Sequence, residues 1–165
     1  MTTRRHCCEI ELPAPPEPVF ALLHTPSAIR GWWGAARAVV IPRPGGTWAA
    51  AWGDSEDQPD YVTSAVLRVF EPPRRLVFTD FQYLARTGPL PFQADLTTEF
   101  IVEPRAGGSC LRVVQDGFPT DPAADAFFAA CEVGWRNTFE GIRRYLQLPA
   151  GPGPQPASAT SSASA

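Results

Sequence analysis

The chain has 165 residues and a formal net charge of -3, and all 14 of its basic residues are arginine. This length predicts a single domain with its own core, and the charge provides no broad basic face for nucleic acid. No apolar run reaches the length of a membrane span, and the N-terminus lacks the apolar segment of a signal peptide, so we expect a soluble, cytoplasmic protein.

The cysteine pattern predicts neither a metal site nor a disulfide. The four cysteines lack the spacing of a zinc site, and the adjacent Cys7 and Cys8 would point to opposite faces of a strand. We therefore expect free thiols, with no metal and no cofactor.

The composition near the C-terminus predicts where the domain ends. From residue 149 the chain has no charge and no aromatic residue, which predicts a domain over residues 1–148 and a disordered tail over residues 149–165.

The predicted elements begin with a strand over residues 6–12, where apolar and polar side chains alternate. Two short helices follow, one over residues 17–24 and a second that begins at Pro26 and ends at Gly31 or Gly34. Apolar segments separated by turn clusters then predict six more strands, over residues 39–42, 47–52, 61–70, 76–81, 94–102 and 110–115. Apolar residues at steps of three or four predict a long helix from Asp121 to about Leu148.

This order of elements predicts an α+β fold. A curved, seven-stranded antiparallel sheet would wrap around the long C-terminal helix, with the two short helices placed after the first strand. Because one helix cannot fill a curved sheet completely, we expect an apolar cavity between the two layers. Such concave apolar spaces are the usual binding sites for small molecules.

Five stretches of the sequence resemble a known family, and the resemblance covers about residues 9–148: "PVFALLHTPSAIRGWWG", "PRPGGTW", "VLRVFEPPRRLVFT", "GGSCLRVVQDGFP" and "GWRNTFEGIRRYL". They are similar to stand-alone bacterial proteins that resemble the C-terminal domain of the heat-shock protein 90 ATPase activator. These proteins belong to the START-like (SRPBCC) superfamily. The resemblance implies the helix-grip fold, whereas the superfamily contains both binding proteins and enzymes, so it implies no single function.

Three of the five tryptophans lie between residues 27 and 48. Adjacent residues of a helix point about 100° apart, so Trp32 and Trp33 cannot share one narrow stripe. The resemblance implies that this pair closes the second short helix at the rim of the cavity. We expect one of the two to pack in the core and the other to face the cavity mouth, with Trp48 on the next hairpin. The alternative is that all three only pack the short helices against the sheet.

Further candidate ligand-binding residues lie on two strands and on the long helix. Asp80 is in phase with Leu76 and Phe78, which predicts an inward carboxylate, unless it is a solvent-exposed residue at the end of its strand. The remaining candidates share inward faces, and core packing is the alternative for each of them. They are Leu96, Thr98 and Phe100 on one strand, and Phe128, Cys131 and Trp135 on the long helix.

The sequence assigns no catalytic residue. It contains no nucleophile elbow, no zinc-protease motif and no phosphate-binding loop. The first hypothesis is therefore a carrier or sensor that binds a small apolar or aromatic molecule. The second is a cyclase-like or hydrolase-like enzyme for an aromatic or polyketide-like substrate, with Asp80 or His24 as acid or base. The third is a chaperone-interacting module, and homodimer formation is left open.

Overall fold

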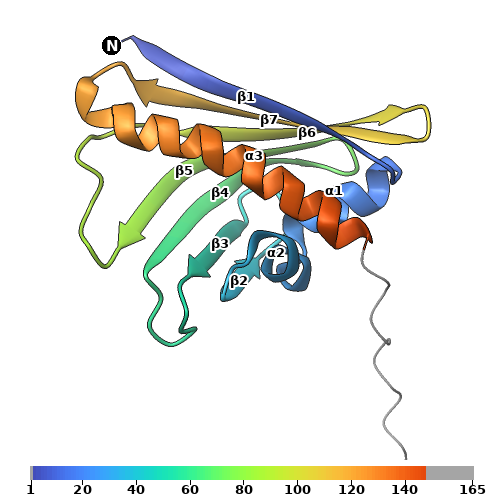
Figure 1. Cartoon of the computed structure of the whole chain (residues 1–165), viewed down its shortest axis with the longest axis horizontal. Coiled ribbons are helices and arrows are strands. Elements are labelled where there is room, and N and C mark those ends of the chain that lie inside the picture. Colours follow the sequence, from blue (N-terminus) through green and yellow to red (C-terminus); the bar gives the residue numbers. More distant parts are fainter. Residues whose placement is uncertain (1, 148–165) are drawn as a thin grey trace, which may run out of the picture.

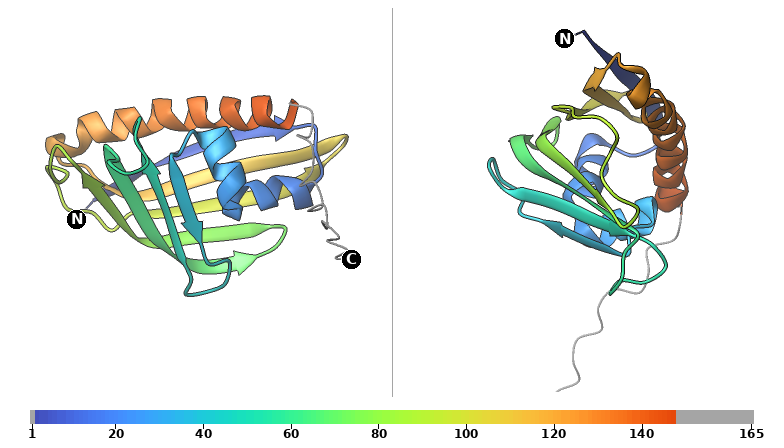
Figure 2. Two further views of the ribbon diagram at one scale, coloured as in Figure 1. Left: turned by 90° about the horizontal axis from the view of Figure 1, so that it is seen from below. Right: turned by 90° about the vertical axis from the view of Figure 1, so that its left-hand side faces the viewer.

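The computed structural model describes residues 2–147, and the tail predicted over residues 149–165 lies outside them. The described chain forms a seven-stranded antiparallel sheet with the strand order β1-β7-β6-β5-β4-β3-β2. The long helix α3 crosses one side of this curved sheet, and two short helices lie near its C-terminal end (Figures 1 and 2). The predicted α+β helix-grip fold is confirmed.

The observed elements follow the predicted order. The strands are β1 (Thr3–Leu12), β2 (Arg37–Val40), β3 (Thr47–Trp52), β4 (Tyr61–Glu71), β5 (Arg75–Ala85), β6 (Thr97–Arg105) and β7 (Gly108–Pro119). The helices are α1 (Pro16–His24), α2 (Pro26–Trp33), the 3-10 turn η1 (Pro122–Ala124) and α3 (Asp125–Gln147). The strands predicted over residues 76–81 and 110–115 extend four residues further, to Ala85 and Pro119, and the strand predicted over residues 94–102 begins at Thr97 and continues to Arg105. Within residues 2–147, no helix has both the length and the apolar character that a membrane crossing requires.

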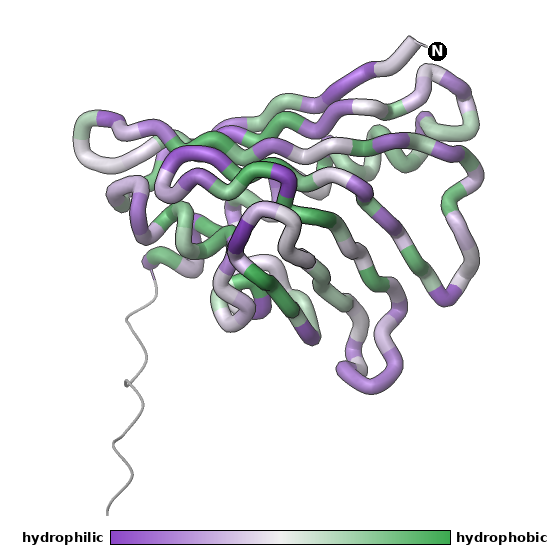
Figure 3. Tube along the Cα trace, turned by 180° about the vertical axis from the view of Figure 1, so that it is seen from behind, coloured by the Kyte–Doolittle hydropathy of each residue, from purple (hydrophilic) through white to green (hydrophobic). Residues whose placement is uncertain are grey.

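The core lies between the concave face of the sheet and the three helices. Hydrophobic and hydrophilic residues alternate along most strands (Figure 3), so that one face of each strand except the edge strand β2 is buried. The largest fully buried side chains come from α1, α2, four strands and α3. Examples are Phe20, Ile29, Leu67, Phe100 and Phe139.

A β-bulge in β5 changes which side chains of this strand face inward. Ser64 of β4 pairs with Gln82 and Val66 pairs with Thr79, so two residues of β5 lie opposite one residue of β4. The first of these two, Asp80, has a positive φ of 54°. The prediction of an inward carboxylate at Asp80 is therefore wrong: the bulge breaks the alternation that the prediction assumed, and Asp80 is exposed.

Helix α3 packs closely on α2 through a glycine. A Cβ atom at Gly141 would collide with the backbone carbonyl oxygen of Trp32, the penultimate residue of α2. Gly134, two turns earlier on the same helix, has no atom within 4 Å of such a Cβ position. The two glycines therefore differ in packing although both lie inside one helix.

This difference gives a matched pair of substitutions. Gly134→Ala should stabilise the protein by about 0.5–1 kcal/mol, because alanine favours helix over glycine. Gly141→Ala should instead destabilise it by about 1–3 kcal/mol, because the new methyl group forces α2 and α3 apart. Urea unfolding followed by circular dichroism measures both changes. A stabilisation of equal size in both variants would contradict the close α2–α3 contact.

Candidate ligand-binding cavity

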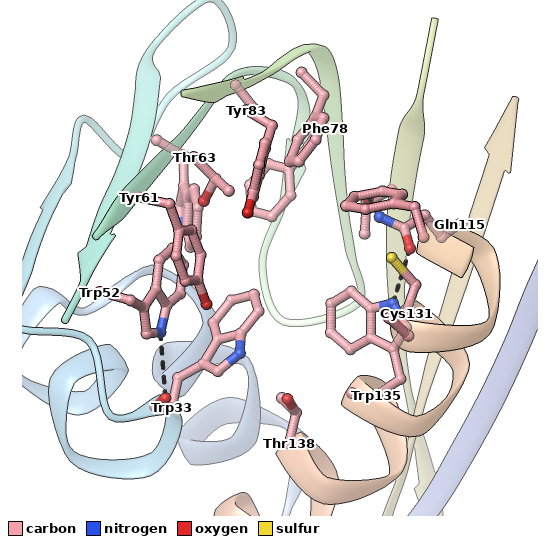
Figure 4. A pocket seen from close by; sticks show the side chains of 17 residues that line it. Trp33, Trp52, Tyr61, Thr63, Phe78, Tyr83, Gln115, Cys131, Trp135 and Thr138 are labelled. Carbon is pink, nitrogen blue, oxygen red and sulfur yellow. Dashed lines mark hydrogen bonds between the residues drawn. The ribbon is translucent and has the colours of Figure 1, made fainter. Parts of the chain in front are cut away.

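A cavity of about 370 Å3 lies between the concave face of the sheet and α3. Its lining residues come from α2, from β3 to β7 and from α3. Figure 4 shows Trp33, Trp52 and Tyr61 on one side of the cavity, and Gln115 and Trp135 on the other. None of the 17 described residues that line the cavity is Asp, Glu, Arg or His, so its wall carries no formal charge at neutral pH.

The ten residues predicted to bind a ligand divide into two groups. Those that line the cavity are Trp33, Trp48, Thr98, Cys131 and Trp135. Those that do not are Trp32, Asp80, Leu96, Phe100 and Phe128. Leu96 and Phe100 are almost completely buried within the protein, and the Phe100 ring packs against Trp135 with the two centroids 5.5 Å apart.

The adjacent tryptophans of α2 have different environments. Trp32 is buried in the core, 5% exposed, and its indole N–H donates a hydrogen bond of 2.9 Å to the carbonyl oxygen of Leu22. Trp33 is half-buried and lines the cavity. The two rings stack with centroids 4.9 Å apart, so the core residue supports the cavity residue.

Trp33 lies at the centre of the tryptophan cluster. Its ring centroid is 5.6 Å from those of Trp48 and Trp135 and 5.4 Å from that of Trp52. Four of the five indole N–H groups donate hydrogen bonds to the protein, and among residues 2–147 only that of Trp33 has no acceptor. This free donor belongs to a residue of the cavity wall.

Phe128 points away from the cavity because a helix turns by about 100° per residue. Its neighbour Phe127 lines the cavity, whereas Phe128 stacks on His6 of β1 with the ring centroids 3.7 Å apart. The His6 Nε2–H group donates to the carbonyl oxygen of Phe128 at 2.7 Å. Phe128 belongs to the predicted apolar stripe of the helix, but it packs against β1 and so attaches the beginning of α3 to the edge of the sheet.

Several lining residues were missed by the sequence analysis. After the bulge at Asp80, the side chains of Phe81 and Tyr83 face the cavity, and no alternation pattern predicts this shift. Tyr61 and Thr63 at the start of β4 also face inward, in phase with buried Ala65 and Leu67. This period-two spacing could have predicted from the sequence that Tyr61 and Thr63 face inward.

Gln115 of β7 is a buried polar residue of the cavity wall. Its side-chain oxygen accepts a hydrogen bond of 3.0 Å from the Trp135 indole N–H. Its side-chain nitrogen donates to the Thr98 hydroxyl at 3.4 Å. Gln115 thereby links α3 to β6 and provides the amide dipole of an otherwise mostly aromatic wall.

Two titratable groups of the wall, Cys131 and Tyr61, stay neutral near pH 7 because burial raises their pKa values. Burial raises the pKa of the Cys131 thiol to about 11. Burial, with a smaller contribution from Tyr83, also raises the pKa of the Tyr61 hydroxyl. The two groups considered as acid or base lie elsewhere, because Asp80 is exposed and His24 packs between Phe20 and Phe70. Residues 2–147 bring together no group of three possible metal ligands.

Comparison with known proteins gives a family and a fold. The profile of a family described as "Activator of Hsp90 ATPase homolog 1-like protein" matches residues 13–147. No curated protein sequence is significantly similar to the chain.

Solved structures share the fold at low sequence identity. Protein MLL2253 from Mesorhizobium loti aligns with a TM-score of 0.70 and 24% identity, over 87% of this chain and 96% of that one. Protein Ms6760 from Mycobacterium smegmatis aligns with a TM-score of 0.71 and 16% identity, over 89% and 93%. DynU16, a protein of the dynemicin biosynthetic locus, aligns with a TM-score of 0.68 and 19% identity, over 86% of this chain and 46% of its own.

The adjacent tryptophans provide a direct test of their two environments. Trp32→Ala should cost about 3–5 kcal/mol of unfolding free energy, because it leaves a cavity in the core. Trp33→Ala should cost only about 1–2 kcal/mol, because its ring is partly exposed and loses chiefly aromatic contacts. Urea unfolding followed by far-ultraviolet circular dichroism avoids the change in fluorescence. Equal losses would show that Trp33 is as much a core residue as Trp32.

The raised pKa of Cys131 predicts slow alkylation. At pH 8 the thiolate fraction of a thiol with a pKa of about 11 is about a hundredfold below that of an ordinary thiol. Iodoacetamide labelling measured by peptide mass spectrometry should therefore be slow at Cys131 and should still accelerate between pH 9 and pH 10. Cys7, which is exposed, is the control for reagent activity. A Cys131 rate that is already constant above pH 9 would contradict the effect of burial.

Proposed function

This chain belongs to the Activator of Hsp90 ATPase homolog 1-like family, and we propose that it binds a small, neutral, apolar or aromatic molecule in the cavity between its sheet and α3. In this role it acts as a carrier or a sensor rather than as a catalyst. The observation that carries the proposal is the composition of the cavity wall, which combines many aromatic rings with an absence of charge among its described residues.

The aromatic wall favours flat ligands. Trp33, Trp52 and Tyr61 form a continuous series of rings on one side, in which Trp52 and Tyr61 stack with centroids 5.1 Å apart. Trp135 faces them from α3 across the cavity (Figure 4). Aromatic rings packed against a ligand contribute both apolar area and ring-to-ring contacts.

The lack of a charged partner disfavours ionic ligands. A carboxylate or ammonium group moved from water into this wall would lose its hydration without gaining an ion pair, and that loss is costly. Burial raises the pKa values of the Cys131 thiol and the Tyr61 hydroxyl, so these two groups of the wall are poor proton donors and acceptors near neutral pH. Binding without turnover is therefore the function that this chemistry supports best.

Aromatic side chains also surround the part of the cavity next to the first turns of α3. Phe127 lines the cavity, and its ring is 5.6 Å, centroid to centroid, from that of Phe92 in the β5–β6 loop and 5.8 Å from that of Tyr83. The Arg86 guanidinium donates to the carbonyl oxygen of Gln58 at 2.7 Å and so joins this loop to the β3–β4 loop.

Titration with N-phenyl-1-naphthylamine, a neutral fluorescent aromatic amine, tests the proposal. We expect a saturable increase in fluorescence with one probe bound per chain. Trp33→Ala should weaken this binding about tenfold, because it removes one face of the site. Val133→Ala is the control on α3, since Val133 is 50% exposed and does not line the cavity.

Two results would contradict the proposal. The first is the absence of saturable binding by the folded protein, which would favour a protein-interaction role. The second is binding that Val133→Ala weakens as much as Trp33→Ala does, since this would place the probe on the surface.

A further inference from the structure

Two buried polar side chains lie next to each other on the concave face of the sheet. Thr98 of β6 and Gln115 of β7 are direct cross-strand partners. Their exposed fractions are 6% and 5%, and both residues line the cavity. The next position in the same row, on β5, is Phe78, which pairs with Thr98 and also lines the cavity.

The chemistry of Trp135 fixes the orientation of the Gln115 amide. An indole N–H can only donate, so the Gln115 oxygen must face Trp135, at 3.0 Å. The amide nitrogen then faces Thr98, and the Thr98 oxygen accepts at 3.4 Å. The hydrogen bonds therefore run in one direction, from α3 through β7 to β6.

This direction leaves unused donors at the wall. The Thr98 hydroxyl has accepted a hydrogen bond, and its own proton has no acceptor among residues 2–147. The second N–H of the Gln115 amide also has none in this part of the chain. The Thr98 oxygen and the Gln115 nitrogen each have one partner, and each carries one further hydrogen that gains a favourable contact when an acceptor lies within reach.

Because both residues line the cavity, an acceptor for these two hydrogens can come from the molecules that occupy it. An ordered water can satisfy these donors when the cavity holds no ligand. A ligand that displaces this water without replacing its hydrogen bonds would leave both donors unpaired, whereas a carbonyl oxygen has two lone pairs and could accept from both. A hydroxyl group is a poorer match, because it adds a donor of its own.

We propose that Thr98 and Gln115 select, among neutral aromatic molecules, those that carry a carbonyl oxygen. The oxygen accepts from the Thr98 hydroxyl and the Gln115 amide, while the rings pack between Phe78 and Trp135. A carboxylate is excluded, because no arginine or histidine is among the described residues of the wall. This inference rests on the proposed ligand-binding function and specifies the class of ligand.

A pair of ligands with matched shapes tests the inference. Fluorene and 9-fluorenone are both flat and neutral, and they differ at one carbon, which in fluorenone carries the carbonyl oxygen. Each is titrated against the protein loaded with N-phenyl-1-naphthylamine, and displacement of the probe is measured. We expect fluorenone to bind at least about fivefold more tightly, which corresponds to one hydrogen bond of ordinary net strength.

Variants identify the source of this preference. Thr98→Val keeps the shape of the side chain and removes the hydroxyl, so the preference should decrease. The double variant Thr98→Val with Gln115→Met removes both donors, and the preference should disappear. Thr97→Val is the matched control, because Thr97 is the adjacent residue of β6 and does not line the cavity.

The outcomes separate the inference from the proposed function. If both compounds displace the probe equally well from the unmodified protein, the cavity binds ligands but does not select a carbonyl group, and the inference fails alone. The same conclusion follows if the double variant folds and keeps the preference. If neither the probe nor either compound binds, the proposed function fails and the inference fails with it. The comparison on the unmodified protein does not depend on the folding of any variant.

Discussion

Helix α3 is fixed to the rest of the protein at both ends, and the cavity depends on this constraint. Near its beginning, Asp125 forms an ion pair with Arg4, and the Phe128 carbonyl accepts from His6 of β1. Near its end, Gly141 allows direct contact with the Trp32 backbone. A straight helix held at two points cannot follow a curved sheet (Figure 2). The space between its middle and strands β3 to β5 therefore stays open.

Aromatic side chains determine how much of this space stays empty. Trp135 is buried and contacts Phe100, so the side of α3 near β6 is filled. On the opposite side, Trp33 is supported from behind by Trp32, with the two rings stacked. Each side of the cavity is thus backed by a rigid packed layer. Because the side chains of these walls are already ordered, the protein loses little side-chain entropy when a flat molecule binds.

The fold is shared by many proteins, whereas the chemistry of the cavity depends on a few individual side chains. Proteins with at most 24% identity to this chain share its fold, and the same fold is compatible with many functions. The chemistry depends instead on a few positions of the wall, such as Thr98 and Gln115. The direction of their hydrogen bonds depends on these individual side chains and on the Trp135 indole.

The sequence by itself determined the order of the elements and the α+β fold, because side-chain periodicity and turn residues act over short distances along the chain. It predicted that Trp32 and Trp33 point in different directions, but only the tertiary structure decided that Trp33 lines the cavity. It did not determine the inward direction of Phe81 and Tyr83, since a bulge at Asp80 shifts the alternation of β5. Nor did it reveal Gln115 as part of the wall. That role requires Trp135 of α3 and Thr98 of β6 to meet one side chain of β7, and only the tertiary structure brings together residues so far apart in sequence.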